Sequence, residues 1–152
     1  MTQIELIADQ LQRSYSGAAW HGPSLEEILA GVTGQQALAR PIAGAHSIWE
    51  LVMHIGVWMS VARRRLAGDT VQPTTEQDWP PIDHGRPAAW QQTLHALEQE
   101  HKQLVAAICL FPESSLENQT PGKKHSQAFL LHGVIQHNLY HAGQIALLKK
   151  AL

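Results

Sequence analysis

The stretch SQAFLLHGVIQHNLYHAGQIALLKK, residues 126–150, decides the fold class and carries the most informative pair of side chains in the chain. Its apolar residues recur with the period of a long amphipathic helix. His137 and His141 are four residues apart, so they lie one above the other on a single helix face. At about 100° per residue, one arc of about 80° contains Leu130, Val134, His137, His141, Ile145 and Leu148. We therefore expect two imidazoles in the middle of a core-facing stripe.

Two imidazoles on such a stripe need polar partners, because burying an unsatisfied polar group costs roughly 1–3 kcal/mol. A shared metal ion would satisfy both rings. Hydrogen bonding within the core, without a metal, is less favoured because no acidic residue lies near them on the same helix. In zincin peptidases a glutamate directly follows the first histidine, whereas Asn138 stands there in this chain. Peptidase chemistry of that type is therefore disfavoured.

Three further long segments show a helical period, and no segment alternates convincingly as a strand. They cover about residues 2–19, residues 47–67 and a stretch that begins near Pro87 and continues to Ile108. Together with the C-terminal helix they predict an all-α four-helix bundle. The proline-rich residues 69–86 are expected to form a long crossover between the second and third long helices.

The segment between the first two long helices is predicted to hold one short helix followed by a loop. Ser24 and Glu27 have the spacing of a capping box, and Gly31 would end the helix that they begin. Residues 32–46, with two glycines and a proline, are predicted as a loop. Three histidines at breaks or helix starts are interpreted as ordinary loop residues: His46, His84 and His125.

A third metal ligand would have to come from another helix, since bundles build such sites from facing helices. His54 is the leading candidate, because it lies about 60° from Leu51, at the edge of the apolar stripe of its helix. His101 competes from the centre of the third stripe. It could complete the metal site, support a ligand, or be a core histidine bonded to a backbone carbonyl.

Four more side chains are candidates for orienting a ligand or lining a pocket. Gln144 lies on the same helix face as His141, about 60° away. His21 follows Trp20 just before a sharp Gly-Pro turn. Ordinary packing or solvation is the alternative reading for every member of this group, which comprises Gln144, Tyr140, Trp58 and His21.

The composition is that of a globular protein, with 44% hydrophobic and 16% charged residues among 152. We expect one domain over residues 1–152. The net charge of −2 argues against a nucleic-acid partner. No apolar segment is long enough to span a bilayer and no secretory signal is visible, which predicts a soluble, cytoplasmic protein without a membrane partner. Cys109, the single cysteine, is expected to be a buried, inert thiol.

Three segments resemble the DinB/YfiT-like family of metalloenzymes: AWHGPSL at residues 19–25, HSIWELVMH at 46–54 and LHGVIQHNLYHAGQI at 131–145. The resemblance covers nearly the whole chain. It implies a four-helix bundle whose divalent metal is held by His54, His137 and His141, the same three residues that the spacing selects. It also implies that the protein forms homodimers, as relatives often do.

Characterised members of this family include metal-dependent transferases and isomerases that use low-molecular-weight thiols such as bacillithiol, mycothiol or glutathione. The resemblance therefore implies a metal-dependent thiol S-transferase, or a related hydrolase or isomerase, that acts on a small molecule. A non-catalytic bundle with a structural or sensory ion is the alternative. Three imidazoles accept several ions, with zinc or nickel expected before iron or copper.

Overall fold

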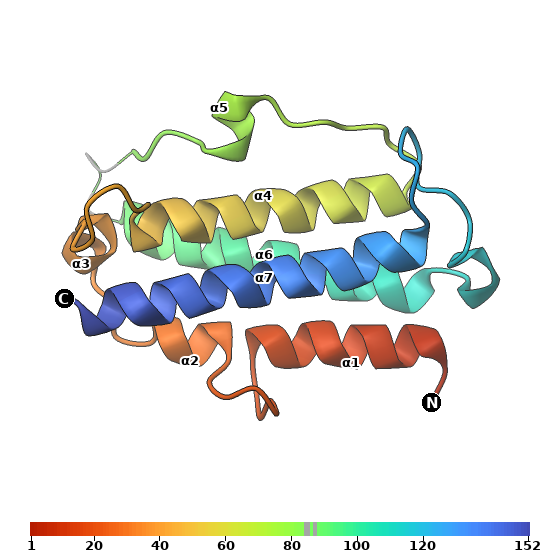
Figure 1. Ribbon diagram of the computed structural model, residues 1–152, viewed down its shortest axis with the longest axis horizontal. Helices are drawn as coiled ribbons and strands as arrows, with labels where there is room; N and C mark the ends of the chain where they lie inside the picture. The colour runs from red at the N-terminus through yellow and green to blue at the C-terminus, as the bar shows by residue number, and fades with distance from the viewer. Residues whose placement is uncertain (84–85, 87) are drawn as a thin grey trace.

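Four long helices lie side by side in the computed structural model, which describes residues 1–83, 86 and 88–152 (Figure 1). They are α1 (Gln3–Tyr15), α4 (Ile48–Leu66), α6 (Ala89–Leu110) and α7 (Gln127–Lys150). Helix α4 packs against α6 and α7, and α1 closes the bundle against the same two helices. No strand occurs among the described residues. The predicted all-α four-helix bundle is confirmed.

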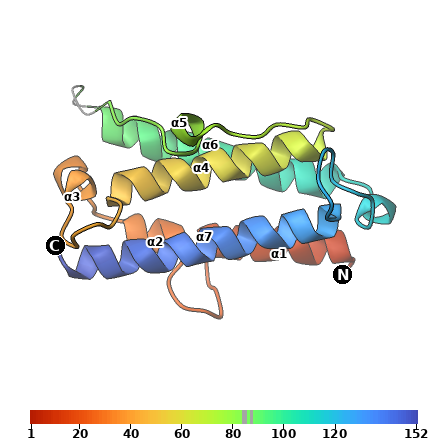
Figure 2. The same cartoon turned by 45° about the horizontal axis from the view of Figure 1, so that its top comes forward.

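The direction of the helices explains the long crossover. Figure 1 shows α4 and α6 running in the same direction, with α1 and α7 running opposite to them. A chain that leaves the end of α4 must therefore return along the whole bundle before α6 can begin. The return segment carries the short helix α5 (Thr75–Asp78) and passes over α4 about midway along the molecule (Figure 2).

Local capping interactions fix where most of the helices begin. A capping box joins a Ser or Thr side chain to a Glu or Gln three residues later, which satisfies two backbone donors at the helix start. Five helices begin in this way, with the pairs Thr2–Glu5, Ser24–Glu27, Thr33–Gln36, Ser47–Glu50 and Thr74–Gln77. The predicted boxes at Ser24 and Ser47 are among them, and α2 (Leu25–Leu29) ends before Gly31 as expected.

The segment predicted as a loop over residues 32–46 contains a helix, α3 (Gly34–Leu38). Its capping box begins at Thr33, and its side chain Ala37 is fully buried. A β-carbon on Gly34 would lie 3.3 Å from that of Trp90, so a glycine permits this close approach to α6. The loop prediction was wrong here because a five-residue helix is too short to show a period.

Two other boundaries differ from the prediction or cannot be compared with it. The first helix ends at Tyr15 rather than near residue 19, because the chain turns extended at Ser16 and Gly17 has a φ of +86°. The expected helix start at Pro87 and the loop histidine His84 lie outside the described residues.

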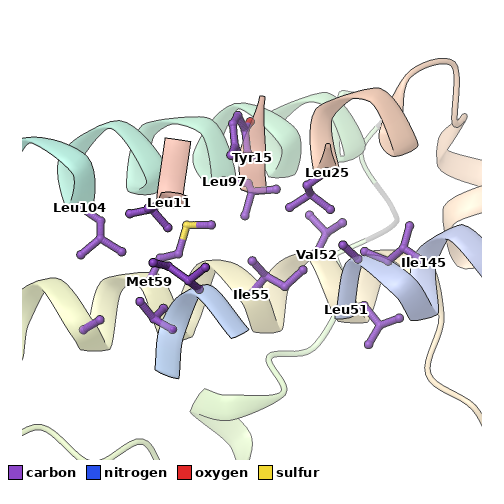
Figure 3. Close-up of a cluster of buried hydrophobic side chains, with 14 of the residues drawn as sticks. Leu11, Tyr15, Leu25, Leu51, Val52, Ile55, Met59, Leu97, Leu104 and Ile145 are labelled. Carbon is purple, nitrogen blue, oxygen red and sulfur yellow. The ribbon is translucent and has the colours of Figure 1, made fainter. Parts of the chain in front are cut away.

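The core is formed by apolar side chains from all four long helices. Figure 3 shows Leu11 of α1, Met59 of α4 and Leu104 of α6 meeting in this core, and all three are fully buried. Cys109 follows the buried Ile108 but is exposed, because one step along a helix turns a side chain by about 100°. The predicted burial of this thiol was therefore wrong.

The buried face of α7 is rotated relative to the predicted stripe. Asn138 and Ile145 occupy its middle, with exposed fractions of 2% and 0%. His137 and His141 lie at its margin, on the side next to α4. No helix in the described part of the chain is long and apolar enough to cross a membrane.

Candidate metal centre

Three histidines from two helices converge at the seam between α4 and α7. One ring nitrogen each of His54, His137 and His141 lies within 4.8 Å of the others. The Nε2 atom of His137 is 3.1 Å from that of His54 and 3.1 Å from that of His141. Nitrogens bound to one tetrahedral ion at about 2.0–2.1 Å are about 3.3 Å apart, so this spacing fits a shared metal ion. We call these three residues the histidine centre.

The outer nitrogen of His54 is held by the crossover segment. Its Nδ1 atom lies 2.9 Å from the backbone oxygen of Asp78 and 3.0 Å from the carboxylate atom Oδ1. The indole of Trp58 donates to the same Oδ1 at 2.7 Å. The backbone oxygen and the carboxylate oxygen of Asp78 only accept hydrogen bonds, so Nδ1 of His54 must carry the proton. The lone pair of its Nε2 then points into the centre.

The outer nitrogen of His141 is held by its own helix. Its Nδ1 atom lies 2.6 Å from Oε1 of Gln144, one turn later on α7. The amide oxygen accepts this hydrogen bond, which leaves the lone pair of Nε2 facing His137. Such outer partners fix the tautomer and orientation of metal-ligating histidines. Asp78 and Gln144 therefore prepare two rings to bind a cation between them.

The electrostatics of the histidine centre disfavour protons. Burial, together with the nearby His141 and His54, lowers the pKa of His137 to about 4. Burial also lowers the pKa of His141, against the opposite effect of the hydrogen bond that His141 donates to Gln144. Nδ1 of His137 is buried without a hydrogen-bond partner among the described residues. Neutral imidazoles are the form that binds metal ions.

A stack of three rings covers one side of the centre. The indole of Trp79 lies between His54, at a centroid distance of 3.9 Å, and His46, at 3.6 Å, with interplanar angles of 4° and 6°. His46 is in turn 3.4 Å from the carboxylate of Glu50. The stack keeps solvent from one face of His54, whose exposed fraction is 6%.

Comparison with known protein families gives an independent result. The family described as the DinB superfamily matches residues 19–145, which include all three residues of the histidine centre. The chain belongs to the DinB superfamily. DinB proteins bind divalent metal ions, in agreement with the chemistry of the three imidazoles. No curated protein and no solved structure gave a significant match to the chain.

In this DinB protein, three of the proposed pocket residues lie at the histidine centre. Gln144 bonds to His141, and the ring of Trp58 lies 5.9 Å from that of His137. Tyr140 sits at the edge, with its ring 5.1 Å from that of His141 and 66% of the residue exposed.

Two other candidates lie elsewhere in the DinB bundle. His101 is buried between α1 and α6, where its ring stacks on Tyr15 at 4.2 Å and its Nε2 atom lies 3.2 Å from Oε1 of Gln12. It is a core histidine, although its partner is a side-chain amide rather than the expected backbone carbonyl. His21 is exposed and belongs to the loop between α1 and α2. Figures 1 and 2 show this loop at the edge of the bundle opposite α5.

Sequence reasoning did not select Asp78 or Trp79, and it interpreted His46 as an ordinary loop residue. All three reach the histidine centre through the path of the loops and crossover, which periodicity does not describe. One signal was available. Trp79 is a large apolar residue in a polar, proline-rich segment, and such a side chain tends to pack against the protein's own core or site.

Proposed function

We propose that this DinB protein is a metal-dependent enzyme, of the thiol-dependent S-transferase type or a related hydrolase or isomerase. His54, His137 and His141 would be the metal ligands. The observation that carries the proposal is the convergence of the three Nε2 atoms of these rings. In two of the rings the outer nitrogen, Nδ1, is already hydrogen-bonded.

The proposed activity needs a Lewis acid and an open approach. A bound divalent ion would supply the Lewis acid, which lowers the pKa of a bound thiol or water molecule towards neutral pH. The protein's own residues do the rest. Asp78 and Gln144 hold the imidazoles, and the Trp79 stack shields one side. His137 is only half-buried, so a small substrate would approach from its side, next to Trp58.

Zinc or nickel is the metal that we propose first, with iron or copper as further options, because all four accept imidazole nitrogen. The ligand set contains no thiolate and no carboxylate among the described residues, so it offers nothing that separates these ions by softness. A small-molecule thiol is the proposed co-substrate. Neither nucleic acid nor a membrane is a proposed partner.

A non-catalytic site is the second candidate, and burial favours it. His54 and His141 have exposed fractions of only 6% and 7%, and the Trp79 stack covers one side. In this case the ion would join α4 to α7 and would raise the melting temperature as any ligand of the native state does. It would have no coordination site open to exchange.

The deciding experiment measures metal content and thiol consumption on the same untagged protein. We expect about one ion per chain, as for a single three-imidazole site. We also expect the protein to consume at least one of several small thiols when an electrophile is present. His137→Gln should lose both, while His95→Gln, at an exposed histidine on α6, should keep both. Full metal content without turnover for any thiol would reject the thiol S-transferase and favour the structural ion. Absence of stoichiometric metal after exposure to all four ions would reject both.

A further inference from the structure

We propose that a second site, distinct from the histidine centre, binds a small organic cation with an ammonium or guanidinium head group. The site is a surface cavity of about 730 Å³ between the end of α1, the α2–α3 segment and the first half of α6. Its polar lining residues are Tyr15, Glu26 and Glu98, together with Thr33, Gln91 and His95. The proposed metal chemistry uses none of these residues.

Tyr15 is a buried polar side chain aimed into this cavity without a partner. Its exposed fraction is 8%, and it lines the cavity. Its ring is fixed by stacking on His101 at 4.2 Å (Figure 3 shows Tyr15 beside α6). Among the described residues its hydroxyl makes no hydrogen bond, so its partner comes from the cavity, either water or a bound molecule.

The charge around that hydroxyl is negative. Glu26 lies on α2 and has no ion pair or hydrogen bond from its side chain to the described residues. Glu98 pairs through Oε1 with Lys102 at 2.5 Å, while its Oε2 lies 3.9 Å from the exposed His95. No lysine or arginine is among the described residues that line the cavity. Clefts lined by one sign of charge concentrate ligands of the opposite sign.

The cavity wall is held in place before any ligand arrives. Lys149, in the last turn of α7, donates to the backbone oxygens of Ile28 and Ala30 at 2.8 Å each. The indole of Trp90 donates to the backbone oxygen of Val32 at 2.8 Å. These contacts fix the α2–α3 segment from two sides, so little ordering of the chain would oppose binding.

The remaining wall selects among cations. Leu29, Val32 and Leu94 supply apolar surface next to the carboxylates. A bare metal ion would leave that surface unused and would find few oxygen ligands. An alkylammonium or alkylguanidinium ion would place its head between Tyr15 and the carboxylates and its short chain against the apolar wall. The proposed ligand is therefore an amphiphilic organic cation.

Calorimetric titration with four probes of one chain length tests this proposal. The probes are n-butylguanidinium, n-butylammonium, n-butanol and butyrate. We expect saturable binding of the two cations and at least about tenfold weaker binding of the alcohol and the anion, since charge-assisted hydrogen bonds are stronger than neutral ones. Equal binding of cation and alcohol, or no saturable binding of either cation, would overturn the proposal.

Variants locate the site and separate it from the histidine centre. Tyr15→Phe keeps the ring stack and should weaken cation binding about fivefold, as should the double change Glu26→Gln with Glu98→Gln. Glu117→Gln, at an exposed carboxylate away from the cavity, is the matched control and should bind as the wild type does. Metal content should be unchanged in all of them. Unchanged binding in both cavity variants would place the cation elsewhere and reject the site.

Discussion

At the scale of single residues, Asp78 connects two parts of the chain that the sequence keeps apart. It accepts hydrogen bonds from His54 and Trp58, although it lies 24 and 20 residues beyond them. A carboxylate on the outer nitrogen of a ligating histidine orients the ring and raises its basicity as a ligand. Asp78 is thus the residue through which the crossover segment acts on the histidine centre.

Replacing Asp78 should weaken metal binding without removing a ligand. We expect Asp78→Ala to lower zinc affinity by about 10–100-fold, the usual effect of losing such an outer partner. Competition with a chromophoric chelator would measure it. Asp69→Ala, which breaks an ion pair with Arg64 on another part of the surface, is the control and should leave affinity unchanged. Wild-type affinity in Asp78→Ala would show that the hydrogen bond does not support the ligand.

His101 should make stability depend on pH. Burial, followed by the nearby Lys102, lowers its pKa to about 4 in the folded protein, against an ordinary value of 6.5. Above pH 6.5 neither the folded nor the unfolded state protonates this ring. As the pH falls from 6.5 towards 4, only the unfolded chain binds the proton, so the free energy of unfolding falls.

The variant His101→Phe keeps a ring beside Tyr15 and removes the titration. Urea unfolding at pH 7.5 and pH 5.0 should show that the wild type loses about 2 kcal/mol more than the variant between these two values. The difference between the two proteins cancels the contribution of His137 and His141, which titrate in the same direction. Equal losses in both proteins would contradict the assignment of His101 as a neutral core histidine.

At the scale of elements, caps of similar chemistry should have different consequences. Ser47 begins α4, a core helix of 19 residues, whereas Thr74 begins α5, which has four residues and no buried side chain. Ser47→Ala should lower the free energy of unfolding by about 1 kcal/mol and leave metal affinity unchanged. Thr74→Ala should lower the metal affinity and leave the free energy of unfolding unchanged, because fraying of α5 displaces Asp78 while the core stays packed. Urea unfolding and chelator competition would measure the two effects, and the same pattern in both variants would contradict this division.

The predictability of the elements follows the range of the forces that form them. The four long helices could be predicted from the sequence because each repeats an apolar residue every three to four positions and begins or ends at a recognisable signal. The same arithmetic selected His54, His137 and His141, which the structure brings together. It placed the α7 pair in the middle of the buried face, whereas Asn138 lies there, since periodicity alone does not tell how far a helix is rotated.

The parts that could not be predicted depend on contacts between distant residues. Trp79 lies between His46 and His54 only because α4 and α6 run in the same direction and the crossover returns over α4. Nothing within residues 69–83 encodes that direction. Helix α3 is fixed by a cap and by packing on Trp90, both outside the range of a periodic signal.

At the scale of the whole molecule, the outer face of α7 is unusual for a surface helix. Three large apolar or aromatic residues on it are mostly exposed: Phe129 at 66%, Tyr140 at 66% and Leu147 at 60%. No Asp, Glu, Lys or Arg occurs between residues 126 and 148. Exposed faces of bundle helices normally carry charge, and an uncharged apolar face marks an interaction site.

The order of residues on this face suits a second copy of the chain, and we propose a homodimer through it. In an antiparallel pair centred on residue 138, Phe129 lies opposite Leu147 of the other copy, and Gly133 lies opposite Gly143. A two-fold interface requires such self-complementarity, and the glycines allow the helices to approach closely.

Light scattering after size-exclusion chromatography would test the dimer. We expect the wild type at twice the chain mass, and Phe129→Glu with Leu147→Glu as a monomer, because four charges would be buried without partners. Leu110→Glu changes an 86% exposed leucine at the end of α6 and is the control that should stay dimeric. A monomeric wild type, or a dimer that survives the double change, would contradict this interface.

The most direct measurement of the central claim is the X-ray absorption spectrum of the zinc-loaded protein. It should show three imidazole nitrogens at about 2.0–2.1 Å together with an additional light atom in an open position. His54→Gln should reduce the imidazole count to two. A shell with fewer than three imidazoles in the wild type, or one that is the same in the wild type and in His54→Gln, would contradict metal binding at the seam between α4 and α7.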